Sequence, residues 1–206
     1  MKKKAMEAAH RHLKKDAKMR RVLKLKLEPR SRPTDAFQSL VRSIIYQQIS
    51  GKAAAAITKK FLALFPGDKF PTPAQVLKVT DAKFKKAGVS PQKRGYLRDL
   101  ALRFTDGTIE PHKFPKMTDE EIREHLIRVK GIGRWTADMF LMFTLYRPDV
   151  LPTGDLAIQK GFQKVFGLRK LPSVMKMEKL AKLWSPHRTV ASLYLWRVVD
   201  GDETDW

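Results

Sequence analysis

The sequence predicts an all-α protein of about nine or ten helices joined by short connections. Three observations support this fold class. Residues that begin helices recur along the chain, glycines follow where those helices should end, and the alternation typical of strands is almost absent. Ile122, Leu126 and Val129 illustrate the spacing of a buried helical stripe.

Helix starts are predicted from N-cap residues followed by favoured first-turn residues, because such side chains accept hydrogen bonds from the first free amides. The pairs are Asp35 with Gln38, Thr72 with Pro73 and Gln75, Ser90 with Pro91, Thr118 with Glu121, and Ser185 with Pro186. We expect each pair to open a helix. Helix ends are expected at Gly88, Gly107 and Gly167, since glycine adopts the left-handed conformation that terminates many helices.

The stretch VKGIGRWTAD, residues 129–138, predicts two helices joined by a tight hairpin. The first helix should span residues 119–129 and the second residues 134–148. Gly131 and Gly133 permit positive φ angles and carry no side chains, so the backbone of the hairpin can approach another surface closely.

The start of the second helix favours an anion. The amides of Ile132, Gly133 and Arg134 precede this helix, where unpaired N–H groups and the helix dipole attract negative charge. A DNA phosphate fits such a position. The alternative is an ordinary corner between helices, in which the glycines only make the turn, and the hairpin residues alone leave both interpretations open.

The charge of the chain indicates a polyanionic partner. The sequence has 42 Lys and Arg residues against 21 Asp and Glu residues, a net charge of +21, and residues 1–30 alone hold twelve basic and three acidic side chains. Nucleic acid is the first interpretation, an anionic membrane surface the second, and a basic enzyme that is simply very soluble the third.

Several classes of protein are excluded by composition. The absence of cysteine excludes disulfides, thiolate zinc sites and iron–sulfur clusters, and five scattered histidines make a metal centre unexpected. The chain has neither a membrane-spanning apolar run nor the apolar core of a signal peptide. We expect a soluble, monomeric, intracellular protein, in the cytoplasm or nucleoid, or in the nucleus if its source is eukaryotic.

A second motif, PTGDLAIQKG at residues 152–161, predicts a loop followed by a helix. Pro152 and Gly154 set up the loop, and Asp155 stands at the amino end of a helix that Gly167 ends. One interpretation is that this aspartate is only an N-cap, which stabilises the helix by about 1 kcal/mol and has no further function. The same position keeps a carboxylate ionised, through the helix dipole and amide hydrogen bonds, so it also suits catalysis.

The two motifs together, in this order and at this spacing, resemble the helix-hairpin-helix DNA glycosylase superfamily. Residues 37–57 and 183–197 are similar to its 3-methyladenine DNA glycosylase II branch, so that the resemblance covers most of residues 35–198. It implies one compact unit, residues 1–206, with a cleft between two lobes. Lobe A is residues 35–150, with the hairpin at 129–134, and lobe B is residues 1–34 with 151–206. The chain departs from longer bacterial members, which have an amino-terminal β-domain, and from the iron–sulfur members.

The resemblance implies a monofunctional enzyme of base excision repair that flips alkylated purines, 3-methyladenine and 7-methylguanine, out of duplex DNA and hydrolyses their N-glycosidic bonds. Asp155 would be the catalytic residue, stabilising the positive charge that develops on the deoxyribose and orienting or deprotonating water. Other acidic candidates are Glu121, Glu124 and Asp138, each of which is explained as solvated helix surface or part of a local ion pair.

The resemblance also assigns the remaining site residues. Gln48 would be the wedge that fills the space of the flipped base, with Tyr46, Trp135 and Trp196 at the base pocket. Without the resemblance, Gln47 and Gln48 are exposed residues that finish a helix, and tryptophans, Trp184 included, are more often core residues. The residues that would bind the DNA backbone are Lys130, Gly131, Ile132, Gly133 and Arg134.

No organic cofactor is implied, but the carbonyls of Ile127, Val129 and Ile132 would hold a sodium or potassium ion. In bifunctional relatives a lysine follows the hairpin and forms a Schiff base with the sugar, and this chain has Trp135 there. Two rival functions stay open. The chain could excise another lesion, such as a deaminated purine, uracil or a mismatched base, or it could be a non-catalytic DNA-binding protein that uses the hairpin as a clamp on the backbone.

Overall fold

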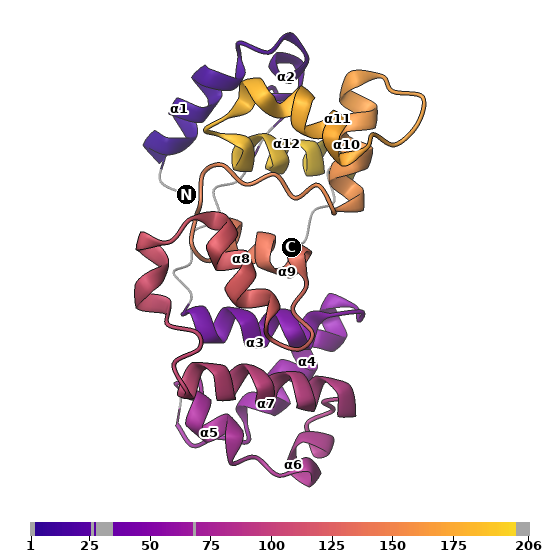
Figure 1. Cartoon of the computed structure of the whole chain (residues 1–206). Coiled ribbons are helices and arrows are strands. Elements are labelled where there is room, and N and C mark those ends of the chain that lie inside the picture. The colour runs from indigo at the N-terminus through magenta and orange to yellow at the C-terminus, as the bar shows by residue number, and fades with distance from the viewer. Residues whose placement is uncertain (1–2, 26, 28–34, 68, 201–206) are drawn as a thin grey trace. The chain divides into compact units, whose positions relative to one another are not determined.

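The computed structural model describes residues 3–25, 27, 35–67 and 69–200, and these residues form helices and no strand (Figure 1). They form twelve α-helices and two 3₁₀ helices, and nine of the α-helices have seven or more residues. The all-α prediction is confirmed, and the helices beyond the expected nine or ten are short ones. No helix in the described ranges has the length and apolar character needed to cross a membrane. Lys2, Lys26 and Arg30 of the basic amino-terminal segment lie outside the described residues.

The chain divides into two compact units, residues 1–33 with 141–206, here unit 1, and residues 34–140, here unit 2. The expected lobes had their boundary at residue 150 instead of 140, so the structure assigns residues 141–150 to the unit that contains both ends of the chain. The cleft between the lobes stays a prediction.

Unit 2 contains the hairpin and the helices that support it. Its helices are α3 (Ala36–Tyr46), α4 (Gly51–Leu62), α5 (Pro73–Leu77), α6 (Asp81–Lys86), α7 (Pro91–Thr105), η1 (Pro111–Lys116), α8 (Asp119–Ile127) and most of α9 (Arg134–Phe143). Helix α7 packs against α3 and α5 (Figure 1). Fully buried side chains from three helices, among them Leu40, Ile44, Phe61, Leu97 and Leu100, form the core of this unit.

Unit 1 is built around the contact between α10 and α12. Its helices are α1 (Lys3–Leu13), α2 (Ala17–Val22), α10 (Leu156–Phe166), α11 (Val174–Leu180), η2 (Ala181–Trp184) and α12 (Arg188–Asp200). Gly161 permits a close approach of α10 to α12, because a Cβ atom there would lie 2.8 Å from the Leu195 backbone. Trp184 is fully buried, stacks on Phe162 at 5.1 Å and donates to Asp16 at 2.8 Å, which confirms the core interpretation of this tryptophan.

Four of the five predicted helix starts are confirmed. Asp35, Thr72, Ser90 and Thr118 are N-caps whose side chains each accept an amide hydrogen bond from the first turn of α3, α5, α7 and α8. Thr72 and Thr118 form complete capping boxes with Gln75 and Glu121. The predicted stops are confirmed too, since Gly88, Gly107 and Gly167 follow their helices with positive φ angles.

The fifth predicted start is wrong. Helix α12 begins at Arg188, and Ser185 precedes it without capping it, since the Ser185 hydroxyl donates to Asp149 Oδ2 at 2.8 Å. Asp149 takes the role expected of Ser185, because its Oδ1 atom accepts the Arg188 amide at 3.1 Å and the Arg188 Nε at 2.8 Å. A carboxylate 39 residues away thus fixes the start of this helix.

The second helix of the hairpin is shorter than predicted. It ends at Phe143 instead of residue 148. Tyr146 has a φ angle of 54°, a left-handed conformation that does not continue a right-handed helix, and the Arg147 amide returns to the Leu141 carbonyl at 2.9 Å. The turn therefore closes before Pro148.

Candidate functional site

The amino end of α10 presents the predicted catalytic carboxylate. Asp155 is the N-cap, as predicted, and its Oδ1 atom accepts the Ile158 amide at 2.8 Å. The preceding loop is a tight turn in which the Asp155 amide donates to the Pro152 carbonyl at 3.0 Å. Because backbone groups fix both the main chain and the side chain of Asp155, the carboxylate has a defined position at the positive end of a helix dipole.

An aromatic pair lies next to this carboxylate. Trp196, on α12, donates its indole N–H to Asp155 Oδ1 at 3.1 Å. The Trp196 ring stacks on Phe143, with ring centroids 5.9 Å apart and planes at 23°. Trp196 is half-buried and the Phe143 side chain is 40% exposed, so an aromatic face stands beside the carboxylate at the surface of unit 1. The sequence suggested Trp196 as a pocket residue but missed its bond to Asp155 and the part played by Phe143.

The hairpin between α8 (Asp119–Ile127) and α9 (Arg134–Phe143) forms where it was predicted, although α8 ends two residues before the expected residue 129 and α9 ends at Phe143. Gly131 has a φ angle of +83°, and a Cβ atom there would lie 2.2 Å from the Tyr96 ring. Gly133 differs, since no described atom lies within 4 Å of a Cβ at that position. The two glycines are therefore needed for different reasons: Gly131 for the fold, and Gly133 only if something else approaches the backbone.

One amide that was expected to be free for an anion is used inside the hairpin. The Ile132 amide donates to the Val129 carbonyl at 3.0 Å, and the Lys130 amide donates to Asp99 Oδ2 at 2.8 Å. The Ile132 amide is therefore not unpaired as expected, because a four-residue turn already satisfies it, and its contact with a phosphate stays a prediction. The amides of Gly133 and Arg134 lie at the start of α9. The exposed Lys130 side chain remains a candidate for contact with phosphate.

Helix α7 and the turn between α3 and α4 contact the hairpin and stabilise it. Asp99 and Tyr96, both on α7, contact the hairpin at Lys130 and Gly131. From the turn after α3, the Gln47 side chain donates to the Gly131 carbonyl at 2.8 Å. Sequence reasoning missed all three supporting residues, and no local pattern marks them, because each acts on a residue more than 30 positions away.

The α3–α4 turn presents the predicted wedge. Gln48 is exposed and has a φ angle of 57°, a conformation that costs a residue with a side chain about 1 kcal/mol or more. Lys93 stabilises the turn by donating to the Ile45 and Gln47 carbonyls at 2.7 Å each, and burial lowers the pKa of Lys93. The two glutamines differ: the Gln47 side chain binds the hairpin, and Gln48 is exposed.

The other predicted pocket residues, Tyr46 and Trp135, are exposed surface residues of unit 2, with 41% and 44% of their surfaces accessible. Tyr46 ends α3 and Trp135 lies in the first turn of α9. Each unit thus carries part of the predicted site: unit 1 has Asp155 with Trp196, and unit 2 has Tyr46, Gln48, the hairpin and Trp135.

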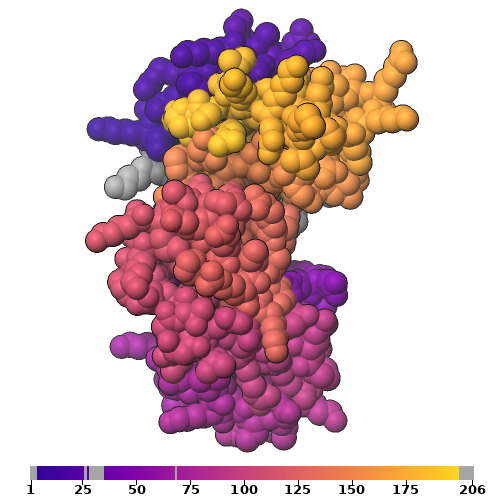
Figure 2. Space-filling model, in the orientation of Figure 1, coloured from indigo at the N-terminus to yellow at the C-terminus, as the bar shows by residue number. Residues whose placement is uncertain are grey.

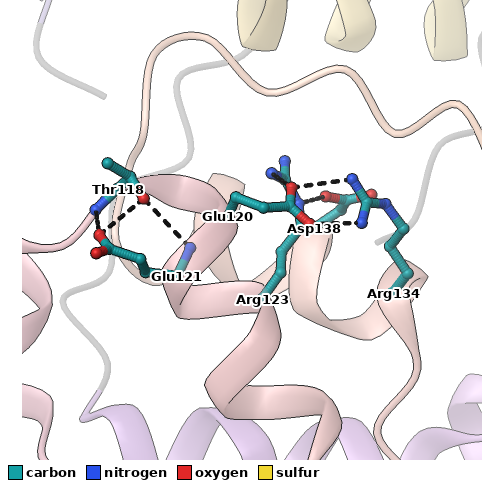
Figure 3. Close-up of polar contacts among 6 residues, drawn as sticks. All are labelled: Thr118, Glu120, Glu121, Arg123, Arg134 and Asp138. Atoms are coloured by element: carbon teal, nitrogen blue, oxygen red, sulfur yellow. Dashed lines mark hydrogen bonds and ion pairs between the residues drawn. The ribbon is translucent and has the colours of Figure 1, made fainter.

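The alternative acidic candidates have structural roles or lie on the surface. Glu121 completes the capping box of Thr118, and Glu124 is exposed. Asp138 is buried, so it is not a solvated surface residue. It forms an ion pair with Arg123 at 2.6 Å, which agrees with the other interpretation, a local ion pair (Figure 3). Burial raises the pKa of the Asp138 carboxyl, and the Arg123 guanidinium opposes this effect.

The side chain of Arg134, a predicted contact to the DNA backbone, is occupied in the free protein. Its Nη1 and Nη2 atoms donate to the two carboxylate oxygens of Glu120 at 2.8 and 3.0 Å (Figure 3). These hydrogen bonds hold the pKa of Glu120 below its ordinary value. The segment from α8 to α9 lies on the visible face of the space-filling view (Figure 2).

The residues expected to bind a monovalent cation are main-chain carbonyls at the end of α8 and in the hairpin. The Val129 carbonyl already accepts the Ile132 amide, and a carbonyl oxygen has a second lone pair for an ion. Ile127 is 49% exposed, whereas Ile132 is buried. Among the side chains that the structure describes, no group of three or more His, Cys, Asp or Glu residues could hold a metal ion.

Comparisons with known proteins agree with these features. The family model described as "HhH-GPD superfamily base excision DNA repair protein" matches residues 41–186. DNA-3-methyladenine glycosylase 1 of Schizosaccharomyces pombe is 34% identical over 164 residues, which cover 79% of this chain and 72% of that protein.

Two solved structures are also similar. The 3-methyladenine DNA glycosylase of Schizosaccharomyces pombe in complex with abasic DNA is 32% identical, with a TM-score of 0.82, and the match covers 96% of this chain and 100% of that chain. The DNA-3-methyladenine glycosidase of Bacillus halodurans is 34% identical, with a TM-score of 0.84, over 92% of this chain and 88% of that chain.

Proposed function

Since this chain belongs to the HhH-GPD superfamily of base excision DNA repair proteins, we propose that it is a monofunctional DNA-3-methyladenine glycosylase. It hydrolyses the N-glycosidic bond of alkylated purines in duplex DNA after the base is flipped out of the helix. The proposal is supported by relatives that carry this name at 32 to 34% identity. The protein would act on DNA in the cytoplasm or nucleoid, or in the nucleus of a eukaryote.

The observation that carries the proposal is the arrangement of Asp155. Breaking an N-glycosidic bond builds positive charge on the deoxyribose, and a fixed carboxylate stabilises that charge. The hydrogen bonds from Ile158 and Trp196 converge on Oδ1. The carboxylate held in this way stabilises the charge on the sugar and orients the attacking water. Trp196 holds the carboxylate in this orientation as well as belonging to the aromatic surface beside it.

The aromatic residues account for the choice of base. A purine alkylated at N3 or N7 carries positive charge, and an aromatic face attracts a desolvated cation by about 1 to 2 kcal/mol. Trp196 with Phe143 in unit 1, and Trp135 and Tyr46 in unit 2, offer such faces. Because a charged base is already a good leaving group, the site needs no general acid, and a broad range of alkylated bases follows.

The hairpin binds the DNA backbone in this proposal. The amides of Gly133 and Arg134 at the start of α9, together with the Lys130 side chain, would contact phosphates on the strand that carries the lesion. A sodium or potassium ion held by the carbonyls of Ile127, Val129 and Ile132 would add positive charge beside the phosphate. No organic cofactor is required.

The proposal is tested by incubating the protein with duplexes that each carry one lesion, scoring released base and strand scission separately. We expect release of 3-methyladenine and 7-methylguanine in preference to uracil, with intact strands. Borohydride should trap no covalent adduct, because Trp135 stands where a Schiff-base lysine would be needed. Trapping of an adduct would contradict the monofunctional mechanism, and a preference for uracil would contradict the substrate class.

Replacing the wedge gives a separate prediction. Gln48→Ala should slow excision by about tenfold and change binding to undamaged duplex by less than about twofold, because the wedge acts only after a base is flipped. Gln48→Gly should give the same two results. Because glycine adopts the left-handed conformation of residue 48 without strain, this variant excludes backbone strain as the cause of the slower excision. Single-turnover excision and equilibrium binding are compared, and equal losses in both would make Gln48 an ordinary surface residue.

A further inference from the structure

Four charged side chains form a ladder across the two helices of the hairpin (Figure 3). The buried Asp138 accepts from Arg123 Nε at 2.6 Å, and Arg123 Nη1 donates to Glu120 at 3.0 Å. Glu120 in turn accepts both guanidinium N–H groups of Arg134, at 2.8 and 3.0 Å. The ladder therefore runs from the interior of unit 2 to the residue that begins α9.

Exposure increases steadily along this ladder. The Arg123 and Asp138 side chains are 12% and 6% exposed, whereas those of Arg134 and Glu120 are 64% and 51% exposed. Breaking a buried pair leaves an uncompensated charge, but an exposed pair contributes at most about 1 kcal/mol. The ladder thus opens most easily at Arg134, and Glu120 still has Arg123 as a partner after Arg134 has left.

From this geometry we propose that Glu120 is a positioning residue that limits the affinity of the hairpin for undamaged DNA. It holds the Arg134 guanidinium in an ion pair that a phosphate must displace. The inference rests on the proposed function in one respect, namely that the hairpin binds the DNA backbone.

The Glu120 carboxylate and a DNA phosphate compete for the Arg134 guanidinium. A cation that contacts a phosphate releases a counterion, which strengthens binding and makes it depend on salt. Glu120 takes Arg134 away from this contact in the free protein. An enzyme that searches for rare lesions needs to bind undamaged DNA weakly. While Arg134 is paired with Glu120, it contributes little to that binding.

The test measures the affinity for an undamaged duplex over a series of salt concentrations. Glu120→Gln should bind about fivefold more tightly at low salt, with the slope of log K against log salt steeper by about 0.9, the value of one added phosphate contact. Glu124→Gln is the matched control, because it removes the same charge from an exposed position on the same helix. Its affinity should change by less than about twofold and its slope should not change, since Glu124 has no ion-pair partner among the described residues and its charge then acts only through the screened field.

The double variant Glu120→Gln/Arg134→Ala should bind like Arg134→Ala alone, because the gain depends on the Arg134 guanidinium that Glu120 no longer holds. Equal gains in Glu120→Gln and Glu124→Gln would overturn the inference, as would a gain that survives in the Arg134→Ala background. Weaker binding by Glu120→Gln would also overturn it, since Glu120 would then direct Arg134 toward the DNA. Normal duplex binding without release of alkylated bases refutes the proposed function alone, whereas absence of duplex binding by the unaltered protein refutes both.

Discussion

Asp155→Asn is expected to lower the rate of base excision by roughly 100-fold or more while leaving duplex binding nearly unchanged. The carboxylate stabilises charge that exists only in the transition state, so its loss affects the chemical step and not the ground-state complex. Single-turnover excision of a 3-methyladenine duplex measures the rate, and equilibrium binding to an undamaged duplex measures the affinity.

Asparagine isolates the charge because its side-chain oxygen can keep both hydrogen bonds that Asp155 Oδ1 accepts, and asparagine caps helices as well as aspartate does. Asp35→Asn is the matched control, since Asp35 caps α3 in the same manner in the other unit. Excision by this control should equal that of the unaltered protein. An Asp155→Asn protein that excises at the unaltered rate would remove Asp155 from the mechanism.

The parts of the fold that the sequence predicts well are those decided by neighbouring residues. A capping box such as Thr118 with Glu121 spans four positions, and its hydrogen bonds form within one turn of helix. The hairpin is local in the same sense, because Gly131 supplies the positive φ angle of its own turn. Asp155 belongs to this group as well, since N-capping depends on the three residues that follow it.

Two features that the sequence did not predict depend on a distant residue that decides the local structure. Ser185 has the composition of a helix start, but Asp149 caps α12 from 39 residues away. The sequence also did not indicate the pairing of Arg134 with Glu120, 14 residues earlier, which occupies its guanidinium in the free protein, and the contact of Arg134 with phosphate stays a prediction. Neither partner can be identified from spacing, because the contact exists only once the helices are packed.

The candidate site shows the same limit. The resemblance assigned Asp155 and Trp196 separately, whereas the hydrogen bond between them joins residues 41 positions apart. The coupling of the α3–α4 turn to the hairpin through Gln47 spans 84 positions. Residue types that form the site could be predicted, but the residues that hold them in position depend on tertiary contacts.

The two hairpin glycines give the second prediction of large effect. Gly131→Ala should destabilise the protein by about 2 to 4 kcal/mol, combining a left-handed residue with a methyl group that meets the Tyr96 ring. Gly133→Ala should change the free energy of unfolding by less than about 1 kcal/mol, because no described atom occupies the position of its Cβ. Denaturant unfolding of both variants measures the difference.

The two glycine variants should also differ in their affinity for duplex DNA. Gly133→Ala should bind duplex DNA about tenfold more weakly in spite of its intact fold, because its methyl group lies where the hairpin backbone approaches a phosphate. Gly131→Ala should lose affinity only in proportion to the distortion of the turn, and Tyr96→Ala should partly restore both its stability and its binding by removing the ring. If Gly133→Ala binds as tightly as the unaltered protein, the backbone at Gly133 does not approach DNA, and contact through the Lys130 side chain would have to account for the affinity of the hairpin.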